Sequence, residues 1–275
     1  MKAVAFTYQA PGSLADALAR LGAGTDVAKT MGGGQSLGPM LNLRLTRPDA
    51  VVDVSRLPEL REVTATPDYV RIGACVTHAQ IEDGVFEPLR GTMLQAVAGG
   101  IAYRAIRNRG TVGGSLAHAD PAADWVVTMT ALGAQIEIAS AAGNRVVPMD
   151  AFMIGAYTTV LEEGELIAAV RVPPAAADTR WGYQKLCRKT GEFAEASCAA
   201  YFDASRRFGR IVLGALDGPP VVLRELTRAV AAQGAEALTA QAVDAAIAHA
   251  APDKDAIDRK LCRTVVTRCV MQMLN

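Results

Sequence analysis

The stretch Met31-Gly32-Gly33-Gly34-Gln35-Ser36-Leu37 directly follows a short apolar segment, Val27 to Met31, for which we predict a β-strand. Three consecutive glycines leave the backbone N–H groups of a turn without a Cβ to shield them, so the turn can wrap closely around an anion. No Gly-Lys-Ser/Thr follows, and the glycines do not form Gly-x-Gly-x-x-Gly at the start of a helix. Taken alone, the triplet is more often a tight turn without a ligand.

A second glycine motif, Asn108-Arg109-Gly110-Thr111-Val112-Gly113-Gly114-Ser115, occurs about seventy residues later. We expect the segment from Arg104 to Ser115 to be a loop whose hydroxyls can donate to phosphate oxygens. Asp120 and Asp124 follow, and a carboxylate shortly after a phosphate turn can accept hydrogen bonds from ribose hydroxyls. Asp120 has an equally good alternative role as a helix cap, because Asp120-Pro121 favours a helix start.

Helices and strands are predicted to alternate around both motifs. Ser13 caps a predicted helix over residues 14–21, and Gly22 ends it. Further helices are predicted over residues 77–82, 92–98 and 120–129, with Thr77 as a cap, and strands over 50–54, 62–64, 70–74, 135–139 and 146–148. This mixture predicts α/β units in the first part of the chain.

Pro173-Pro174-Ala175-Ala176-Ala177-Asp178 is the clearest boundary signal in the sequence. After it we predict three strands, over residues 181–185, 197–203 and 210–216, followed by helices over 225–233, 239–250 and 255–274. Strands followed by helices predict a C-terminal α+β domain with a three-stranded antiparallel sheet. The predicted fold class is therefore α+β, with units at 1–56, 57–174 and 175–275.

Composition excludes several classes of function. The 275 residues carry 28 basic and 28 acidic side chains, so no positive excess would hold a nucleic acid or an anionic membrane. We expect no membrane span and no signal peptide, and a cytoplasmic location. The five cysteines form no Cys-x-x-Cys pair, and the three histidines are scattered, so no metal site is predicted. No acid–base pair stands out, and no catalytic residue is assigned.

The order and spacing of the motifs resemble the FAD-binding medium subunit of the molybdenum hydroxylase family, of the carbon monoxide dehydrogenase and xanthine dehydrogenase type. The resemblance covers the whole chain and is carried by several further segments: 39–45, 53–55, 72–74, 120–124, 164–167 and 183–191. Gly32 replaces an alanine more usual in the family, and Val112 replaces an isoleucine. Some relatives insert an iron–sulfur loop, but this chain has no cysteine cluster.

The resemblance implies a PCMH-type FAD-binding fold, in which FAD lies between two N-terminal α/β subdomains, 1–56 and 57–174. The two glycine motifs are then expected to hold the diphosphate, Asp124 the ribose or ribityl region, and Leu37 and Ile101 the flavin or adenine. Tyr183 and Lys185 match positions near the isoalloxazine, and Lys185 could stabilise reduced FAD. The full set of expected cofactor contacts is Met31, Gly32, Gly33, Gly34, Gln35, Ser36, Leu37, Ile101, Thr111, Gly113, Gly114, Ser115, Asp120, Asp124, Ile167, Tyr183 and Lys185.

The resemblance also implies partners. A large subunit would bear the molybdenum cofactor, a small subunit two [2Fe-2S] clusters, and the complex would be a dimer of heterotrimers that delivers electrons to an external acceptor. One alternative is a stand-alone flavin oxidoreductase of the same fold, which would need its own acid–base residues. Another is a scaffold that has lost its cofactor, which the two intact glycine motifs argue against.

Overall fold

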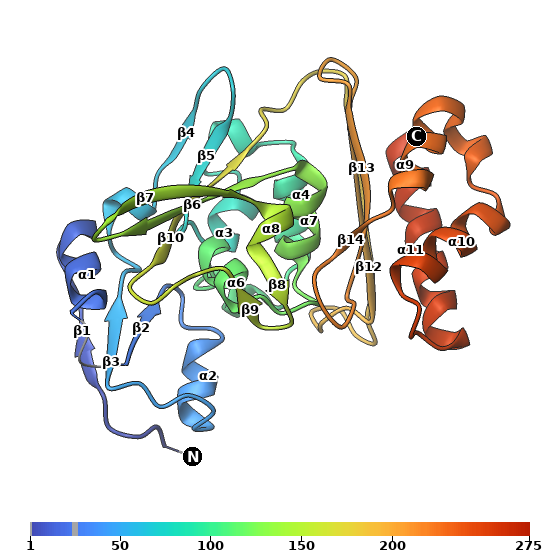
Figure 1. Cartoon of the computed structure of the whole chain (residues 1–275). Coiled ribbons are helices and arrows are strands. Elements are labelled where there is room, and N and C mark those ends of the chain that lie inside the picture. The colour runs from blue at the N-terminus through green and yellow to red at the C-terminus, as the bar shows by residue number, and fades with distance from the viewer. Residues whose placement is uncertain (1, 24–26) are drawn as a thin grey trace.

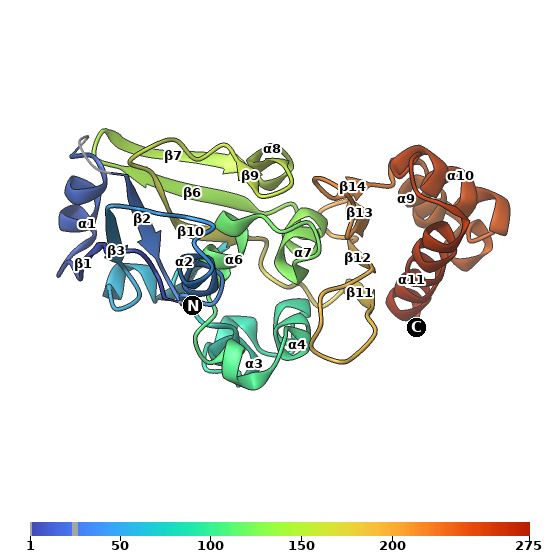
Figure 2. The ribbon, with the colours of Figure 1, turned by 90° about the horizontal axis from the view of Figure 1, so that it is seen from below.

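The computed structural model describes residues 2–23 and 27–275. The elements lie in a row, with a small parallel sheet at one end, a larger sheet and most helices in the middle, and a third sheet backed by helices at the C-terminal end (Figures 1 and 2). Among the residues that the structure describes, no helix combines the length and apolar character needed to cross a membrane.

The first unit is a three-stranded parallel sheet in the order β1-β3-β2. Its strands are β1 (Thr7–Gln9), β2 (Ala28–Met31) and β3 (Ala50–Asp53), and its helices are α1 (Leu14–Leu21) and α2 (Leu37–Asn42). As predicted, the Ser13 hydroxyl caps α1 by accepting a hydrogen bond from Asp16 N, and the helix ends at Gly22. Leu18 and Leu21 of α1 pack with Val52 of the central strand in a small core.

The second unit is an antiparallel sheet in the order β4-β5-β10-β6-β7. These strands are β4 (Val63–Ala65), β5 (Val70–Gly73), β6 (Gln135–Ser140), β7 (Gly143–Pro148) and β10 (Leu166–Val172), and a small hairpin joins β8 (Met153–Gly155) to β9 (Thr158–Thr159). The predicted pairing of the strands near residues 63 and 72, and the hairpin between residues 135 and 148, are confirmed.

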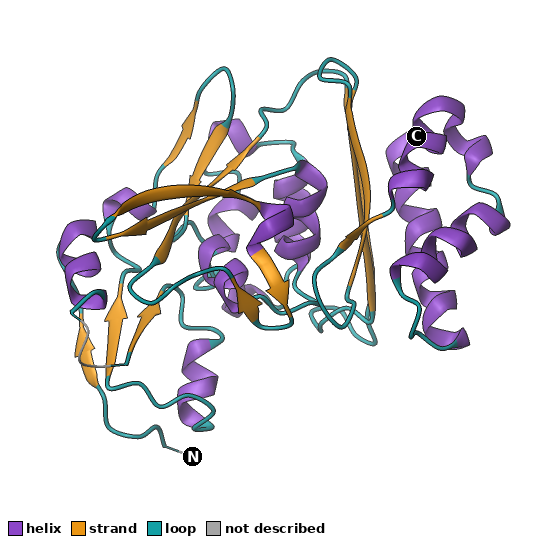
Figure 3. Ribbon diagram, in the orientation of Figure 1, coloured by secondary structure: helices purple, strands orange, loops and turns teal. Residues whose placement is uncertain are grey.

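Helices cover this sheet on the side of the C-terminal unit (Figure 3). They are α3 (His78–Glu82), α4 (Met93–Gly100), α5 (Arg104–Arg107), α6 (Val112–His118), α7 (Asp124–Leu132) and α8 (Met149–Phe152), with the 3-10 turn η2 (Glu87–Leu89). The 3-10 turn η1 (Pro58–Leu60) lies towards the first unit, where Leu60 packs in the same core as α1. Helix α7 is buried along its whole length and packs against the sheet of the third unit. The main core therefore runs continuously from the middle sheet through α7 to the third unit.

The third unit is an antiparallel sheet in the order β11-β12-β13-β14, covered by helices on its outer face (Figure 1). The strands are β11 (Thr179–Leu186), β12 (Ala196–Asp203), β13 (Phe208–Gly214) and β14 (Val221–Val222). The helical elements are α9 (Arg224–Gln233), η3 (Gly234–Ala237), α10 (Ala240–Ala250) and α11 (Ala256–Leu274). The three predicted helices are confirmed, and α11 packs across β11 and β12.

The structure corrects three sequence-based predictions. The C-terminal sheet has four strands rather than three, because the two-residue β14 is too short to show an alternating pattern. The segment 104–115, predicted to be a loop, contains α5 and the start of α6. The helix predicted to begin at Asp120 begins at Asp124, because the Asp120 carboxylate accepts a hydrogen bond from Ala122 N and closes a separate turn.

Candidate cofactor site

The first glycine loop connects β2 to α2 and is closed by a hydrogen bond from Gly38 N to Gly34 O, 2.9 Å. Gly34 has a φ of 72°, in the left-handed region that glycine adopts without strain. Among the described residues, no acceptor pairs with the five successive N–H groups of Gly32 to Ser36. Buried or half-buried N–H groups normally find partners, so a run of five such donors marks a place built to receive an acceptor.

The second glycine motif has a different structure. Thr111 is the N-cap of α6, and its hydroxyl accepts a hydrogen bond from Gly114 N, 3.1 Å. The N–H groups of Val112 and Gly113 donate to Val76 O (3.1 Å) and Ala74 O (2.8 Å), and Ser115 N donates to Thr111 O. Within the part of the chain that the structure describes, the N–H groups of Val112 to Ser115 therefore all have protein acceptors, whereas the Ser115 hydroxyl makes no hydrogen bond; that this motif holds the diphosphate stays a prediction.

The two motifs touch each other, although they are about seventy residues apart in the chain. A Cβ placed on Gly33 would lie 1.8 Å from Arg109 O, and one placed on Gly32 would lie 2.9 Å from the Thr111 hydroxyl oxygen. The glycines of the first loop are thus needed for close contact with the second motif as well as for access to an anion. Arg109, which sequence reasoning missed as a contact residue, supplies the carbonyl against which Gly33 packs.

His78 and Trp125 support the second motif from behind. His78 N donates to Gly110 O (3.0 Å), and the Trp125 indole N–H donates to His78 Nδ1 (3.0 Å). Burial, with a smaller contribution from the nearby charge of Arg107, lowers the pKa of His78 from 6.5 to about 4. The ring is therefore neutral near pH 7 and acts as a structural acceptor. Sequence reasoning treated His78 as one of three scattered histidines and did not find this role.

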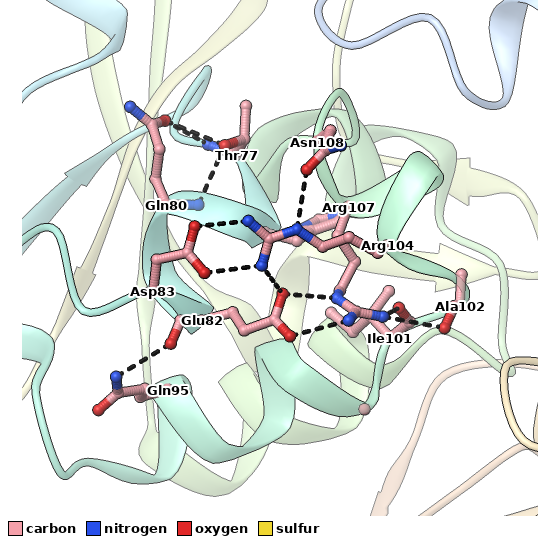
Figure 4. A network of polar contacts seen from close by, with 12 residues as sticks. Thr77, Gln80, Glu82, Asp83, Gln95, Ile101, Ala102, Arg104, Arg107 and Asn108 are labelled. Carbon is pink, nitrogen blue, oxygen red and sulfur yellow. Dashed lines mark hydrogen bonds and ion pairs between the residues drawn. The ribbon is translucent and has the colours of Figure 1, made fainter.

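An ion-pair network fixes the turn that follows α4 (Figure 4). Arg107 forms paired hydrogen bonds with Glu82, at 2.7 and 2.8 Å, and donates to the carbonyl oxygens of Ile101 and Ala102. Ala102 has a φ of 44°, an unusual value for a residue with a Cβ, so this turn needs such restraint. The network thereby sets the position of Ile101, which is half-buried against the main core.

Asp124, Tyr183 and Lys185, predicted separately as cofactor contacts, form one cluster. The Tyr183 hydroxyl and Lys185 Nζ both donate to Asp124 Oδ1, at 2.6 and 2.8 Å, and Lys185 Nζ also donates to Gly100 O at 2.8 Å. Burial raises the pKa of Tyr183 well above its usual range, and the Asp124 carboxylate adds to this. The cluster joins β11 of the third unit to α7 and to the end of α4, next to Ile101.

The remaining predicted contacts lie at several places in the fold. Met31 ends β2, and Leu37 begins α2, so both flank the first loop. Ile167 is buried at the bulge of β10. Asp120 accepts from Ala122 N and, at 3.4 Å, from the Tyr157 hydroxyl, so both of its carboxylate oxygens already have protein donors.

These features define a class of protein: an α+β chain in which a glycine loop presents unpaired backbone donors to an anionic, nucleotide-type ligand. A family model described as "FAD binding domain in molybdopterin dehydrogenase" matches residues 4–175. The chain is 36% identical to the carbon monoxide dehydrogenase medium chain of Hydrogenophaga pseudoflava over 258 residues, which cover 91% of this chain and 88% of the relative.

Two further comparisons agree. The chain is 38% identical over 199 residues to the nicotine 6-hydroxylase medium subunit of Paenarthrobacter nicotinovorans, covering 72% of this chain and 69% of that one. A chain of quinoline 2-oxidoreductase from Pseudomonas putida 86 superposes with a TM-score of 0.90 and 31% identity, over 100% of this chain and 98% of that chain. The protein belongs to the family of FAD-binding medium subunits of molybdenum-containing dehydrogenases, and it is an oxidoreductase subunit.

Proposed function

We propose that this chain is the FAD-binding electron-transfer subunit of a multi-subunit molybdenum hydroxylase. It would take electrons from [2Fe-2S] clusters of a partner subunit and pass them through FAD to an external acceptor. The observation that carries the proposal is the run of five unpaired N–H groups from Gly32 to Ser36, held in place by contact with the second motif. This arrangement fits a diphosphate, because successive backbone N–H groups can donate to its oxygens.

Several residues would bind and orient FAD, and each uses a group that the structure leaves free. The N–H groups of the first loop would donate to the diphosphate oxygens, and the Ser36 and Ser115 hydroxyls would add side-chain donors. Asp124 Oδ2 has no donor among the described residues, so it could accept from a ribose or ribityl hydroxyl. Leu37, Ile101 and Ile167 would supply apolar contacts to the ring systems. FAD itself supplies the electron-transfer chemistry.

Lys185 and Tyr183 would set the electrostatic environment of the flavin. We propose that the Lys185 ammonium favours the reduced, anionic state of FAD, as its place in the family motif suggests. Its pairing with Asp124 tempers this effect, because the carboxylate cancels much of the charge seen from a distance. A Lys185→Ala variant would lower the flavin potential and leave FAD affinity nearly unchanged, which a potentiometric titration measures.

We infer the partners from the relatives, which are named as medium chains and medium subunits. A large subunit with the molybdenum cofactor and a small subunit with two [2Fe-2S] clusters would complete the enzyme as a dimer of heterotrimers in the cytoplasm. Substrate oxidation then belongs to the large subunit. The division of this chain at residues 56 and 174 into two FAD-binding subdomains and a C-terminal domain is part of the same proposal.

The test is to isolate the native complex and identify its components. We expect flavin absorbance from this chain, together with two co-purifying subunits that carry molybdenum and iron–sulfur centres. A flavin-containing chain that purifies alone and turns over a substrate would favour the alternative of a stand-alone flavin oxidoreductase. If the chain binds no flavin, whether in the complex or purified alone, both the proposed function and this alternative are contradicted.

A further inference from the structure

A cavity lies at the junction between the middle and C-terminal units, and no residue of the two glycine motifs lines it. It has a volume of about 110 Å³ and is walled mainly by apolar side chains, including Leu89, Leu94, Leu132, Val172 and Trp181. The linker between β10 and β11 closes one side through Pro173, Ala175 and Ala176. Pockets for small molecules occur preferentially at such junctions between units.

Tyr201 gives this cavity a polar group. Trp181 and Tyr201 face each other across the β11–β12 pair, so both side chains point to the same side of the sheet and line the cavity. Tyr201 is 3% exposed, and its hydroxyl has no hydrogen-bond partner within normal distance and angle among the residues that the structure describes. Burial, the largest effect on this group, raises the pKa of Tyr201, so the hydroxyl is a neutral O–H donor.

A second polar feature lies at the same cavity. Thr92, Met93 and Leu94, from the first turn of α4, line it, and no side chain caps this helix start. The Thr92 hydroxyl instead donates to Leu89 O at 2.7 Å. Uncapped N–H groups at a helix start are donors that favour a partial negative charge. A buried phenol hydroxyl and residues of an uncapped helix start therefore line the same cavity.

We propose that this cavity is a binding site for a compact ring molecule, of about benzene's size, that carries one hydrogen-bond-accepting oxygen. An apolar cavity of about 150 Å³ binds benzene, so the observed volume of about 110 Å³ is near the size of a single ring. The apolar walls would bind the ring, and the Tyr201 hydroxyl would donate to the oxygen. The site is separate from the proposed FAD contacts, and the proposal does not depend on them.

The test uses phenol and toluene, two probes of similar shape. Phenol carries a hydroxyl group where toluene carries a methyl group. The chain has two tryptophans, Trp181 in the cavity and Trp125 bonded to His78, so their indole N–H signals in NMR spectra give a reporter and an internal control. In the full chain we expect both probes to shift the Trp181 signal saturably and leave Trp125 unchanged. Phenol should bind about five- to tenfold more tightly than toluene, as one buried hydrogen bond predicts.

Two variants make the test specific. Tyr201→Phe removes only the hydroxyl and should abolish the preference for phenol while keeping toluene binding. Ala176→Leu should fill the cavity and abolish binding of both probes, with an unchanged Trp125 signal showing that the chain is folded. The proposal is overturned if neither probe shifts Trp181, if Tyr201→Phe keeps the preference, or if binding persists in a folded Ala176→Leu chain.

Discussion

The two glycine motifs look alike in the sequence but differ in what their backbone does. In the first loop, the N–H groups of Gly32 to Ser36 have no acceptor within residues 2–23 and 27–275, whereas in the second motif the N–H groups of Val112 to Ser115 all donate to the protein. The first loop is thus free to bind a ligand, and the second is a helix start anchored to the strand–turn at residues 74–76. Glycine allows close packing in both motifs, and in the first loop it also leaves the backbone N–H groups accessible.

A glycine-rich sequence therefore predicts that another group lies close to the backbone, but it does not show whether that group is a ligand or another part of the chain. At Gly113, a Cβ would lie 2.5 Å from the Ala74 Cβ, so the approaching group is another part of the chain. At Gly33 the approaching group is the Arg109 carbonyl, which puts the second motif directly behind the first. The two regions therefore act as a pair: the second supports the geometry in which the first presents its donors.

The largest effect is expected from breaking this contact. Gly33→Ala places a Cβ within 1.8 Å of a backbone oxygen that no rotamer change can move, so the two motifs must separate. We expect a loss of stability of about 3 kcal/mol or more, with loss of bound FAD. Urea unfolding and the flavin content of the purified chain measure the two effects.

Gly99→Ala is the matched control for this change. Gly99 lies inside α4, where a Cβ would only touch the Glu82 side chain at 3.8 Å. Alanine is favoured over glycine in a helix by about 0.5–1 kcal/mol, so this variant should be slightly more stable and keep its FAD. If Gly33→Ala behaves like Gly99→Ala, the contact between the motifs has no supporting role.

The next prediction concerns the ion pair between Asp124 and Lys185 and its contribution to stability. Asp124→Asn removes the charge that pairs with Lys185, whose side chain is only 14% exposed. Leaving this ammonium without its partner should lower stability by about 2 kcal/mol. Adding Lys185→Met to Asp124→Asn should recover part of the loss, because the unpaired charge is then gone. Strictly additive effects in this double-mutant cycle would show that the ion pair contributes nothing.

Because His78 supports the second motif as a neutral ring, we predict that the free energy of unfolding depends on pH. The pKa of His78 falls from 6.5 to about 4 on folding, so between these values the unfolded chain binds a proton that the folded chain does not. The stabilising contribution is complete above about pH 6.5 and is lost as the pH falls towards 4, by about 3 kcal/mol in total. His78→Asn, which keeps an acceptor near Trp125 but cannot titrate, should remove this part of the pH dependence from unfolding curves.

The smallest loss of stability is expected from removing the Thr111 hydroxyl, which caps helix α6. Thr111→Val keeps the shape of the side chain but removes the oxygen that accepts from Gly114 N. Loss of such a cap costs about 1 kcal/mol. Since the first loop keeps its own geometry, FAD should still be retained. Complete loss of FAD in this variant would mean that the Thr111 hydroxyl binds the cofactor directly.

Periodic apolar patterns predicted most of the regular structure, including α1, the β6–β7 hairpin and the three C-terminal helices. The second motif was mispredicted as a loop because two glycines argue against a helix, while the packing of Gly113 on Ala74 that favours it is a tertiary contact. Asp124 and Lys185 are 61 residues apart, so their hydrogen bond was equally invisible. The residue types thus predicted a cofactor site, but only the fold shows which of its hydrogen-bonding groups have no protein partner.

We propose that the backbone N–H groups of the first loop bind the diphosphate, whereas the second motif positions that loop and adds only the Ser115 hydroxyl. Amide hydrogen exchange, measured on the chain with and without FAD, tests this most directly. We predict that the amides of Gly32 to Ser36 exchange rapidly without FAD and become strongly protected when it binds, while those of Val112 to Ser115 are protected in both states. Unchanged exchange in the first loop, with new protection confined to the second motif, would contradict the account.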